Sequence, residues 1–503
     1  MPAHPATVYP AADSDGESPF AGLLRLLFAT FLSIVAALLV YLTAGSLFVV
    51  PGIVVAAVCL VLLVRHLELG VYFLLGAAIF VEQFHIFGLD NIPALKIPLY
   101  LNLNLVTGIG ALVFNPIEAL LGLMVLIWLL RAATSRQWRL RSIPGIVPTV
   151  LFLAVLAGYV VFGLARGGQF TVALWEVRAL FYLLGVFFIA TQVLYTRRHI
   201  TICLWIIAVA LGVKGLQGCW RFFVTLGGHL GDIPAITGHE DALFLSTGFI
   251  LLLACVLQGV RGRLVWFLAL TTPATLLTFI VTQRRIAYGT LSLSSIITVL
   301  YLPRRARLLA LKCAVPLALA GVIYTATFWN SSSTVALPIQ QARSVFATGS
   351  EADSSNTYRD VENFNLQQTI RSHPVGVGFG KKYLIILPLA EVEFPLWDYI
   401  PHNCIYWMWA KTGWIGFIIF WLFFGSLLTR LSIDVRNTRD PRDRALLLMV
   451  LTFVFSQVVI AYYDLQITFY RNMIYLGVAL AMWTAVRNLQ HGPHRTTQCA
   501  ESA

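Results

Sequence analysis

Charged residues are scarce in this chain: Asp, Glu, Lys and Arg make up 12% of its 503 residues. A soluble domain carries about 25%, so the composition excludes an ordinary soluble globular protein. The hydrophobic share is 58% and the mean hydropathy is +0.80. Apolar runs long enough to cross a bilayer, which takes about 20 residues, recur along the whole length. The composition predicts an all-α polytopic membrane protein.

Cysteine pairs at redox or metal-binding spacing are also missing. The seven cysteines are scattered, mostly inside apolar runs, and none forms a C-x-x-C pair. They are typical of small buried hydrophobic residues. Residues 2–19 lack the basic start of a cleaved signal and carry Asp13, Asp15 and Glu17 instead. We therefore expect the first apolar run to remain as a helix.

The apolar runs and the charged breaks between them predict about 14 transmembrane helices (12–14). Hydropathy places them at 21–43, 46–64, 67–87, 112–131, 145–164, 178–195, 200–224, 241–260, 264–282, 286–302, 309–328, 404–428, 445–463 and 470–486. The expected domains are a cytoplasmic tail (1–20), helices 1 to 11 (21–328), a large exofacial loop (329–403), helices 12 to 14 (404–486) and a cytoplasmic tail (487–503).

Arginine in the connections sets the expected orientation. If the spans alternate, one face receives Arg65, Arg131, Arg136, Arg139, Arg141, Arg197, Arg198, Arg261, Arg263, Arg304, Arg305, Arg307 and the cations from Arg430 to Arg444. The positive-inside rule makes that face cytoplasmic. The pI of about 9.5 then mostly reflects the arginines of the cytoplasmic connections, and it does not indicate nucleic-acid binding.

Arg284 and Arg285 break this rule, because they lie in a tight turn on the opposite, exofacial face. An arginine at bilayer depth costs roughly 2.5–3.5 kcal/mol on insertion scales. One interpretation is that both side chains reach toward head-group phosphates. Two adjacent cations on the unfavoured side favour a functional role.

The polar insert 329–403 ends in Pro401-His402-Asn403, where the next apolar run begins. Its cations are Arg343, Arg359, Arg371, Lys381 and Lys382. A titratable imidazole beside fixed cations at a lipid–water boundary suits chemistry on a lipid-linked anion. A magnesium site needs clustered carboxylates, and the exofacial acids Asp360, Glu362, Glu391, Glu393 and Asp398 contain no D-x-D. We expect neither metal nor cofactor.

Within the insert, the apolar spacing from Tyr358 to Ile370 predicts a mildly amphipathic helix along the membrane face. The following Gly376, Gly378 and Gly380 permit turns and close backbone approach. A nucleotide-binding loop is disfavoured because no strand-turn-helix context surrounds them. His373, in this turn, is interpreted as structural, and His239 precedes a helix start.

Several segments together resemble the O-antigen ligase superfamily. They are Glu176-Val177-Arg178 with Tyr182, Thr282-Gln283-Arg284-Arg285, Arg359, Pro374-Val375-Gly376-Val377-Gly378, His402-Asn403 and Thr412-Gly413-Trp414-Ile415-Gly416. The resemblance covers roughly 176–476. Arg285 matches the family arginine, whereas Arg284 stands where serine is usual and Ile286 where glycine is usual. The predicted span number also exceeds the family's usual one.

The resemblance implies a GT-C-like, metal-independent glycosyltransferase in the bacterial cytoplasmic (inner) membrane, with its active site on the exofacial side. It would move a glycan from undecaprenyl pyrophosphate to an acceptor hydroxyl on a lipid or glycan, in cell-surface polysaccharide biosynthesis. His402 would be the general base. Arg285, Arg359, Arg178 and Arg284 would bind pyrophosphate, supported by Asn403, Gly376 and Gly378.

The residue chemistry agrees with these roles. Arginine binds phosphate oxygens bidentately and stays charged, and histidine starts near the pKa that a general base needs. An O-antigen or exopolysaccharide polymerase of the same superfamily would use the same residues. A flippase or transporter of a lipid-linked saccharide remains an alternative from another class; it predicts charges buried mid-helix and repeated halves.

Overall fold

The computed structural model describes residues 30, 33, 49–83, 97–110, 112–134, 140–230, 233, 235–331, 333–345, 354–390 and 394–491. The predicted N-terminal tail, nearly all of the span expected at 21–43 and the end of the C-terminal tail lie outside these ranges. So do Glu391 and Glu393.

All of the regular elements among the described residues are helices. They are α2 (Val49–Arg65), α3 (Glu68–Phe80), α4 (Leu103–Thr107), α5 (Pro116–Thr134), α6 (Ile146–Ala165), α7 (Phe170–Val193), α8 (Arg197–Trp220), η2 (Arg221–Thr225), α9 (Asp241–Leu257), α10 (Arg263–Val281), α11 (Arg285–Tyr301), α12 (Arg304–Phe328), η3 (Thr334–Ala336), α13 (Leu337–Val345), α14 (Ser354–Ser372), α15 (Cys404–Asn437), α16 (Pro441–Ala461), η5 (Gln466–Thr468) and α17 (Tyr470–His491). The all-α class is confirmed for this part of the chain.

Eight described helices are long and apolar enough to cross a membrane, or nine if α2 and α3 together form one span. The polytopic character is confirmed, and the total of about 14 stays a prediction. α17 falls outside the eight because it is less apolar. Its residues from Tyr470 to Val486 are buried in protein, so this helix can carry Arg471 and Asn472 without exposing them to lipid.

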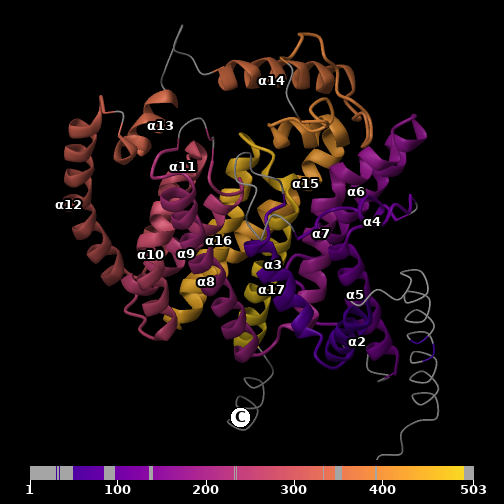
Figure 1. The fold of residues 1–503 in the computed structure, drawn as a ribbon, viewed down its shortest axis with the longest axis horizontal. Coiled ribbons are helices and arrows are strands. Elements are labelled where there is room, and N and C mark those ends of the chain that lie inside the picture. The colour runs from indigo at the N-terminus through magenta and orange to yellow at the C-terminus, as the bar shows by residue number, and fades with distance from the viewer. Residues whose placement is uncertain are drawn as a thin grey trace, which may run out of the picture. The chain divides into compact units, whose positions relative to one another are not determined.

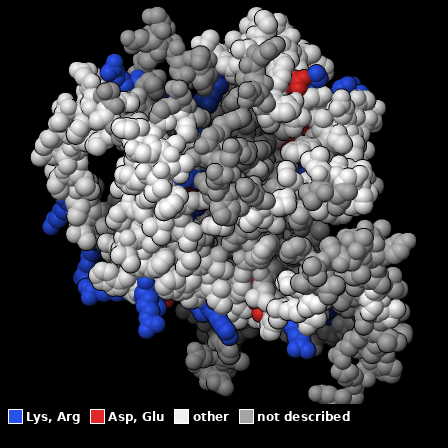
Figure 2. Space-filling view, in the orientation of Figure 1, with Lys and Arg blue, Asp and Glu red and all other residues white. Residues whose placement is uncertain are grey.

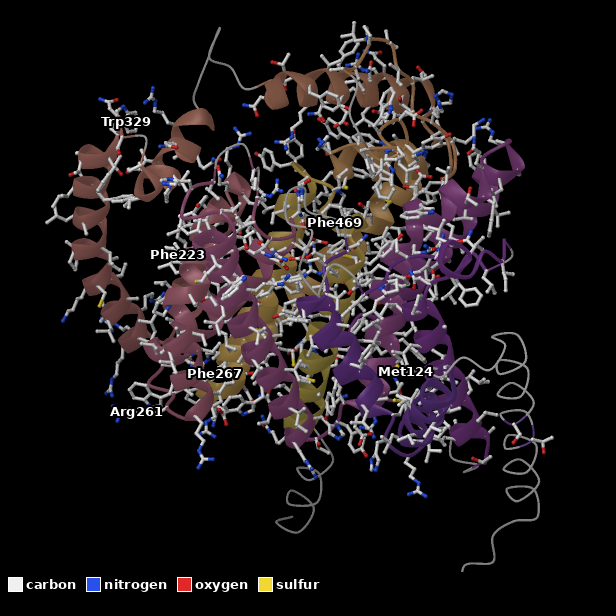
Figure 3. The ribbon with its side chains drawn as sticks, viewed as in Figure 1. Met124, Phe223, Arg261, Phe267, Trp329 and Phe469 are labelled. Carbon is white, nitrogen blue, oxygen red and sulfur yellow. The ribbon has the colours of Figure 1, made fainter. Side chains whose placement is uncertain are left out.

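The chain divides into two compact units: residues 1–69 with 125–139, and residues 70–124 with 140–503. In the larger unit, α17 packs on α7, α8 on α10, and α15 on α6 and α16. α14 lies across the N-terminal end of α15 (Figure 1). The opposite end, where α8, α10 and α16 begin, is here called the basic end; Lys and Arg gather along it in Figure 2. Figure 3 labels Arg261 there and Trp329 at the other end.

Candidate functional site

The helix α14 is the element that positions the site. Its inward side carries the apolar Leu366 and the polar Asn365 and Thr369, and the two polar side chains bind the segment 384–387. The Asn365 side chain accepts the N–H groups of Ile386 at 3.0 Å and Leu387 at 2.9 Å and donates to the Leu387 carbonyl at 2.8 Å. Thr369 Oγ1 accepts the Leu384 N–H at 2.9 Å. The predicted helix at 358–370 is present as part of α14. Hydrogen bonds from its side chains to the backbone of residues 384–387 hold it in place.

His402 and Glu362 form a dyad between α14 and the start of α15. The Glu362 carboxylate accepts the His402 backbone N–H at 2.8 Å and lies 3.2 and 3.3 Å from the imidazole Nδ1. Glu362 is buried, whereas 33% of the His402 side chain is exposed. A carboxylate at Nδ1 favours the tautomer with a proton there, which leaves Nε2 as the acceptor. The sequence spacing gave no signal for this pairing.

Tyr358 lies one turn before Glu362 on the same side of α14 and completes the wall around the imidazole. Its ring meets the His402 ring edge to face, with centroids 5.6 Å apart. Burial, and then the negative charge of Glu362, raise the pKa of Tyr358 to about 12. The phenol therefore stays neutral at physiological pH, and the imidazole has one carboxylate and one neutral ring beside it.

Asn403 fixes the start of α15. Its Oδ1 accepts the Tyr406 N–H at 3.0 Å as the helix N-cap, and its Nδ2 donates to Asn363 Oδ1 at 2.9 Å. The same side chain therefore caps one helix and holds the other. These contacts set the position of His402, the preceding residue.

A cavity of about 330 Å³ opens beside the dyad. It is lined by Asn356, Arg359, Asp360, Glu362, Asn363, His402, Asn403, Tyr462 and Tyr463. Arg359, predicted to bind pyrophosphate, thus shares a cavity with His402. The two tyrosines come from the end of α16 and are exposed. Amphipathic rings next to hydrogen-bonding side chains suit the faces and hydroxyls of a sugar.

A second cluster, His239 with Asp464 and Arg284, lies within electrostatic reach of the dyad. His239 Nδ1 is 4.0 Å from Asp464 Oδ2, and 45% of the His239 side chain is exposed. Loss of water around the ring, and then the charge of Arg284, lower the pKa of His239 to about 4, with smaller effects from His402 and Arg359 and an opposing one from Asp464. His239 is therefore neutral at pH 7.

Asp464 stays ionised in this cluster. Burial alone would raise its pKa, but His239, a hydrogen bond from Gln466 at 2.9 Å and the charge of Arg284 outweigh burial and lower it. His239 was interpreted only as preceding a helix start, and its pairing with Asp464, 225 positions further along the chain, has no local sequence signal.

The turn between α10 and α11 presents the paired arginines. Gln283 adopts a left-handed φ of 55°, and Thr282 Oγ1 lies 2.9 Å from Thr237 Oγ1, which joins this turn to the segment before His239. Arg284 precedes α11, and Arg285 is its first residue, partly buried. Arg284 acts electrostatically on both His239 and Asp464.

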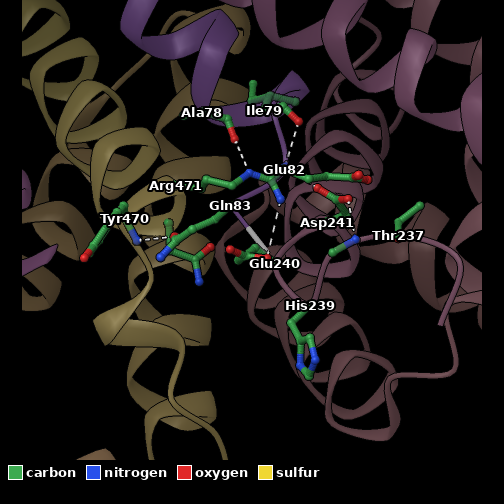
Figure 4. A network of polar contacts seen from close by, with 12 residues as sticks. Ala78, Ile79, Glu82, Gln83, Thr237, His239, Glu240, Asp241, Tyr470 and Arg471 are labelled. Atoms are coloured by element: carbon green, nitrogen blue, oxygen red, sulfur yellow. Dashed lines mark hydrogen bonds and ion pairs between the residues drawn. The ribbon is translucent and has the colours of Figure 1, made fainter. Parts of the chain in front are cut away.

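A buried ionic network holds the backbone beneath His239 (Figure 4). Arg471 donates to the carbonyls of Ala78 at 2.7 Å and Ile79 at 2.9 Å and pairs with Glu240 and Asp241. Asp241 also accepts the Gly238 N–H at 2.9 Å. Since each acid here is paired, the network stabilises the 238–241 segment, and the His239 ring points away from Arg471.

The glycine-rich turn at 376–380 packs closely against the backbone of α15. Gly376 and Gly378 have φ of 90° and 83°, and a Cβ on Gly376 would lie 2.5 Å from the Lys411 carbonyl oxygen. Only glycine permits both the conformation and the approach. The buried Lys411–Glu176 pair, 2.6 Å apart, lies beside it, and Glu176 also accepts the Gly380 N–H.

Arg178 has other partners. Its Nε lies 2.8 Å from Glu118 Oε1, and its terminal nitrogens donate to Asn102 Oδ1 at 2.7 Å and to the Val113 carbonyl at 2.8 Å. These partners share no residue with those of His402. Arg178 therefore joins α7 to the α4–α5 region. Arg359 and Arg284, in contrast, lie toward the dyad.

Residues 270–421 match the family described as O-antigen ligase. The matched segment runs from within α10 into α15 and includes Arg284, Arg359, Glu362 and His402. A search of curated proteins finds no match. This segment, with its paired arginines, α14 and His402, supports the resemblance of the chain to the O-antigen ligase superfamily.

Proposed function

We propose that the protein is a membrane glycosyltransferase that transfers a glycan from undecaprenyl pyrophosphate to an acceptor hydroxyl. The observation that carries the proposal is the His402–Glu362 dyad, 2.8 to 3.3 Å apart, in a cavity shared with Arg359. The family match over residues 270–421 supports the reaction class, and the dyad supports the proposed acid–base chemistry.

In the proposed reaction, His402 Nε2 takes the proton of the acceptor hydroxyl. The hydroxyl oxygen then forms a bond to the anomeric carbon, and the bond from that carbon to the pyrophosphate oxygen breaks with its electron pair staying on the phosphate. Glu362 stabilises the imidazolium that forms. General bases of this kind contribute about a hundred- to ten-thousand-fold.

The negative charge on the departing pyrophosphate requires cations, and we assign this role to Arg359 and Arg284. Both lie within electrostatic range of His239, and Arg359 also lines the cavity that contains His402. Arginine binds phosphate through two parallel N–H groups and cannot lose its charge. Arg285, on the same turn, is the further candidate from the family resemblance.

A polymerase of the same superfamily would use this site with a second lipid-linked glycan as acceptor. A flippase is less well supported, because the family that residues 270–421 match is described as O-antigen ligase. We further propose that the His402 end is exofacial and the basic end cytoplasmic. Cysteine labelling from outside intact cells should then modify a cysteine at Ser354 but not at Thr438.

The test is transfer by the purified protein with undecaprenyl-pyrophosphate glycan, acceptor and EDTA. Glycan on a lipid acceptor supports a ligase, and lengthened lipid-linked glycan supports a polymerase. Movement of the donor across a vesicle membrane without any new glycosidic bond would overturn the transferase proposal. His66→Ala, a change at an exposed histidine outside the site, is the matched control for His402→Ala.

A further inference from the structure

A second cavity, of about 850 Å³, lies at the basic end, far along the helices from His402. It is formed by the starts of α8, α10 and α16 and by the end of α9. Its charged lining residues are Arg197, Arg261, Arg263, Asp440, Arg442 and Asp443. The proposed transfer reaction uses none of them.

The acids of this cavity are already occupied by protein donors. Asp443 pairs with Arg197 and accepts the Gln490 side chain at 3.1 Å. Asp440 caps α16 and accepts the Arg442 N–H at 2.7 Å. Among the described residues, Arg261, Arg263 and Arg442 form no ion pair with a carboxylate. Four arginines against two aspartates leave the lining with a net positive charge.

The cavity is also divided by polarity. Arg261, Arg263 and Arg442 are exposed at its mouth, whereas Leu251 and Leu446 are buried and Trp205 is partly buried. The Trp205 ring is held against Phe267, with centroids 5.7 Å apart. A free anion would satisfy the arginines and leave the apolar wall in water, so the site suits an amphiphile with an anionic head.

We propose that this cavity binds one anionic phospholipid, with its phosphate at Arg261, Arg263 and Arg442 and its acyl chains along Leu204 and Trp205. Basic pockets between transmembrane helices at the cytoplasmic face have this chemistry. Arginine matches a phosphate oxygen pair geometrically, and its weak hydration lowers the cost of entering the head-group region. The Arg261-Gly262-Arg263 turn brings two of the cations to one helix start.

Native mass spectrometry of the detergent-purified protein tests the proposal with phosphatidylglycerol and phosphatidylcholine. We expect one retained phosphatidylglycerol and much weaker retention of phosphatidylcholine. Replacing Arg261, Arg263 and Arg442 together by Gln should weaken retention about a hundredfold, from the attraction of each cation to anionic lipid. The matched control replaces Arg304, Arg305 and Arg307 by Gln, which removes equal charge from the nearby start of α12.

Three results would overturn the proposal: equal retention by the triple variant, equal loss in the control variant, or equal binding of both lipids. Complete displacement of phosphatidylglycerol by millimolar inorganic phosphate would instead assign the arginines to a free anion. If the triple variant does not fold, Arg261→Gln with Arg263→Gln on the exposed turn serves as the test variant. None of these measurements depends on glycan transfer.

Discussion

Replacing Glu362 with Gln tests the dyad without changing its shape. The carboxylate accepts the His402 backbone N–H at 2.8 Å and faces Nδ1 at 3.2 Å. A glutamine oxygen can keep the first contact, but its NH₂ group then faces Nδ1 as a donor. The imidazole must present a lone pair at Nδ1, so the proton moves to Nε2 and the base is lost.

The size of the loss follows from this change of tautomer. An equivalent carboxylate-to-amide change in a Ser-His-Asp triad costs about ten-thousand-fold in kcat, and the whole contribution of a general base is about a hundred- to ten-thousand-fold. We therefore expect kcat for Glu362→Gln to fall at least about a hundredfold, with KM for the lipid donor unchanged.

Steady-state transfer measured with purified protein gives both constants. Asp360→Asn is the comparison, because Asp360 lines the same cavity from the same helix; it should alter KM for the acceptor more than kcat. A Glu362→Gln protein that melts at the wild-type temperature and keeps most of its kcat would refute the orienting role of Glu362.

Three further predictions concern the cations and the second histidine. Arg359→Lys and Arg284→Lys keep the charge but lose the planar fork, so donor turnover should drop sharply in each at unchanged melting temperature. The pKa of His239 is lowered to about 4 in the folded protein, whereas in the unfolded chain it is about 6.5. Between about pH 6.5 and 4 the unfolded chain therefore binds a proton at His239 that the folded protein does not bind, so thermal stability should fall as the pH falls through this range. His239→Asn should reduce this pH dependence. Arg178→Lys leaves Glu118 and Asn102 with fewer donors, so its melting temperature should fall while the activity of the folded fraction is kept.

Controls separate these outcomes. Arg305→Lys, at the start of α12, should transfer glycan at the wild-type rate. Wild-type rates in both Arg359→Lys and Arg284→Lys would rule out phosphate clamping by these side chains. If melting depends on pH identically in His239→Asn and wild type, His239 is protonated equally in the folded and unfolded states. If Arg178→Lys loses activity at normal stability, Arg178 contributes to pyrophosphate binding.

The helices were predictable because their signal is local. The span expected at 264–282 is observed as α10 at Arg263–Val281, and the one at 286–302 as α11 at Arg285–Tyr301. Charged breaks end such helices wherever the chain leaves the apolar phase. α17 shows the limit of this rule. It is enclosed by protein, so a charged residue, Arg471, can lie inside the helix without contacting lipid.

The site was predictable only in part. His402 and Arg359 stood out because each is a polar residue of a suitable type in the one large insert. Glu362 did not, since a carboxylate 40 positions away becomes a partner only when α14 lies across α15. The family resemblance implied pyrophosphate binding by Arg178. Its contact with Glu118 depends on how the helices pack, which the sequence spacing does not reveal.

The central claim is that His402 does chemistry while the arginines hold the donor. Its most direct test is His402→Ala, measured for equilibrium binding of undecaprenyl-pyrophosphate glycan and for single-turnover transfer. We expect donor binding near the wild-type Kd and a transfer rate lower by about a hundred- to ten-thousand-fold. Near-normal single-turnover transfer by well-folded His402→Ala protein would contradict it.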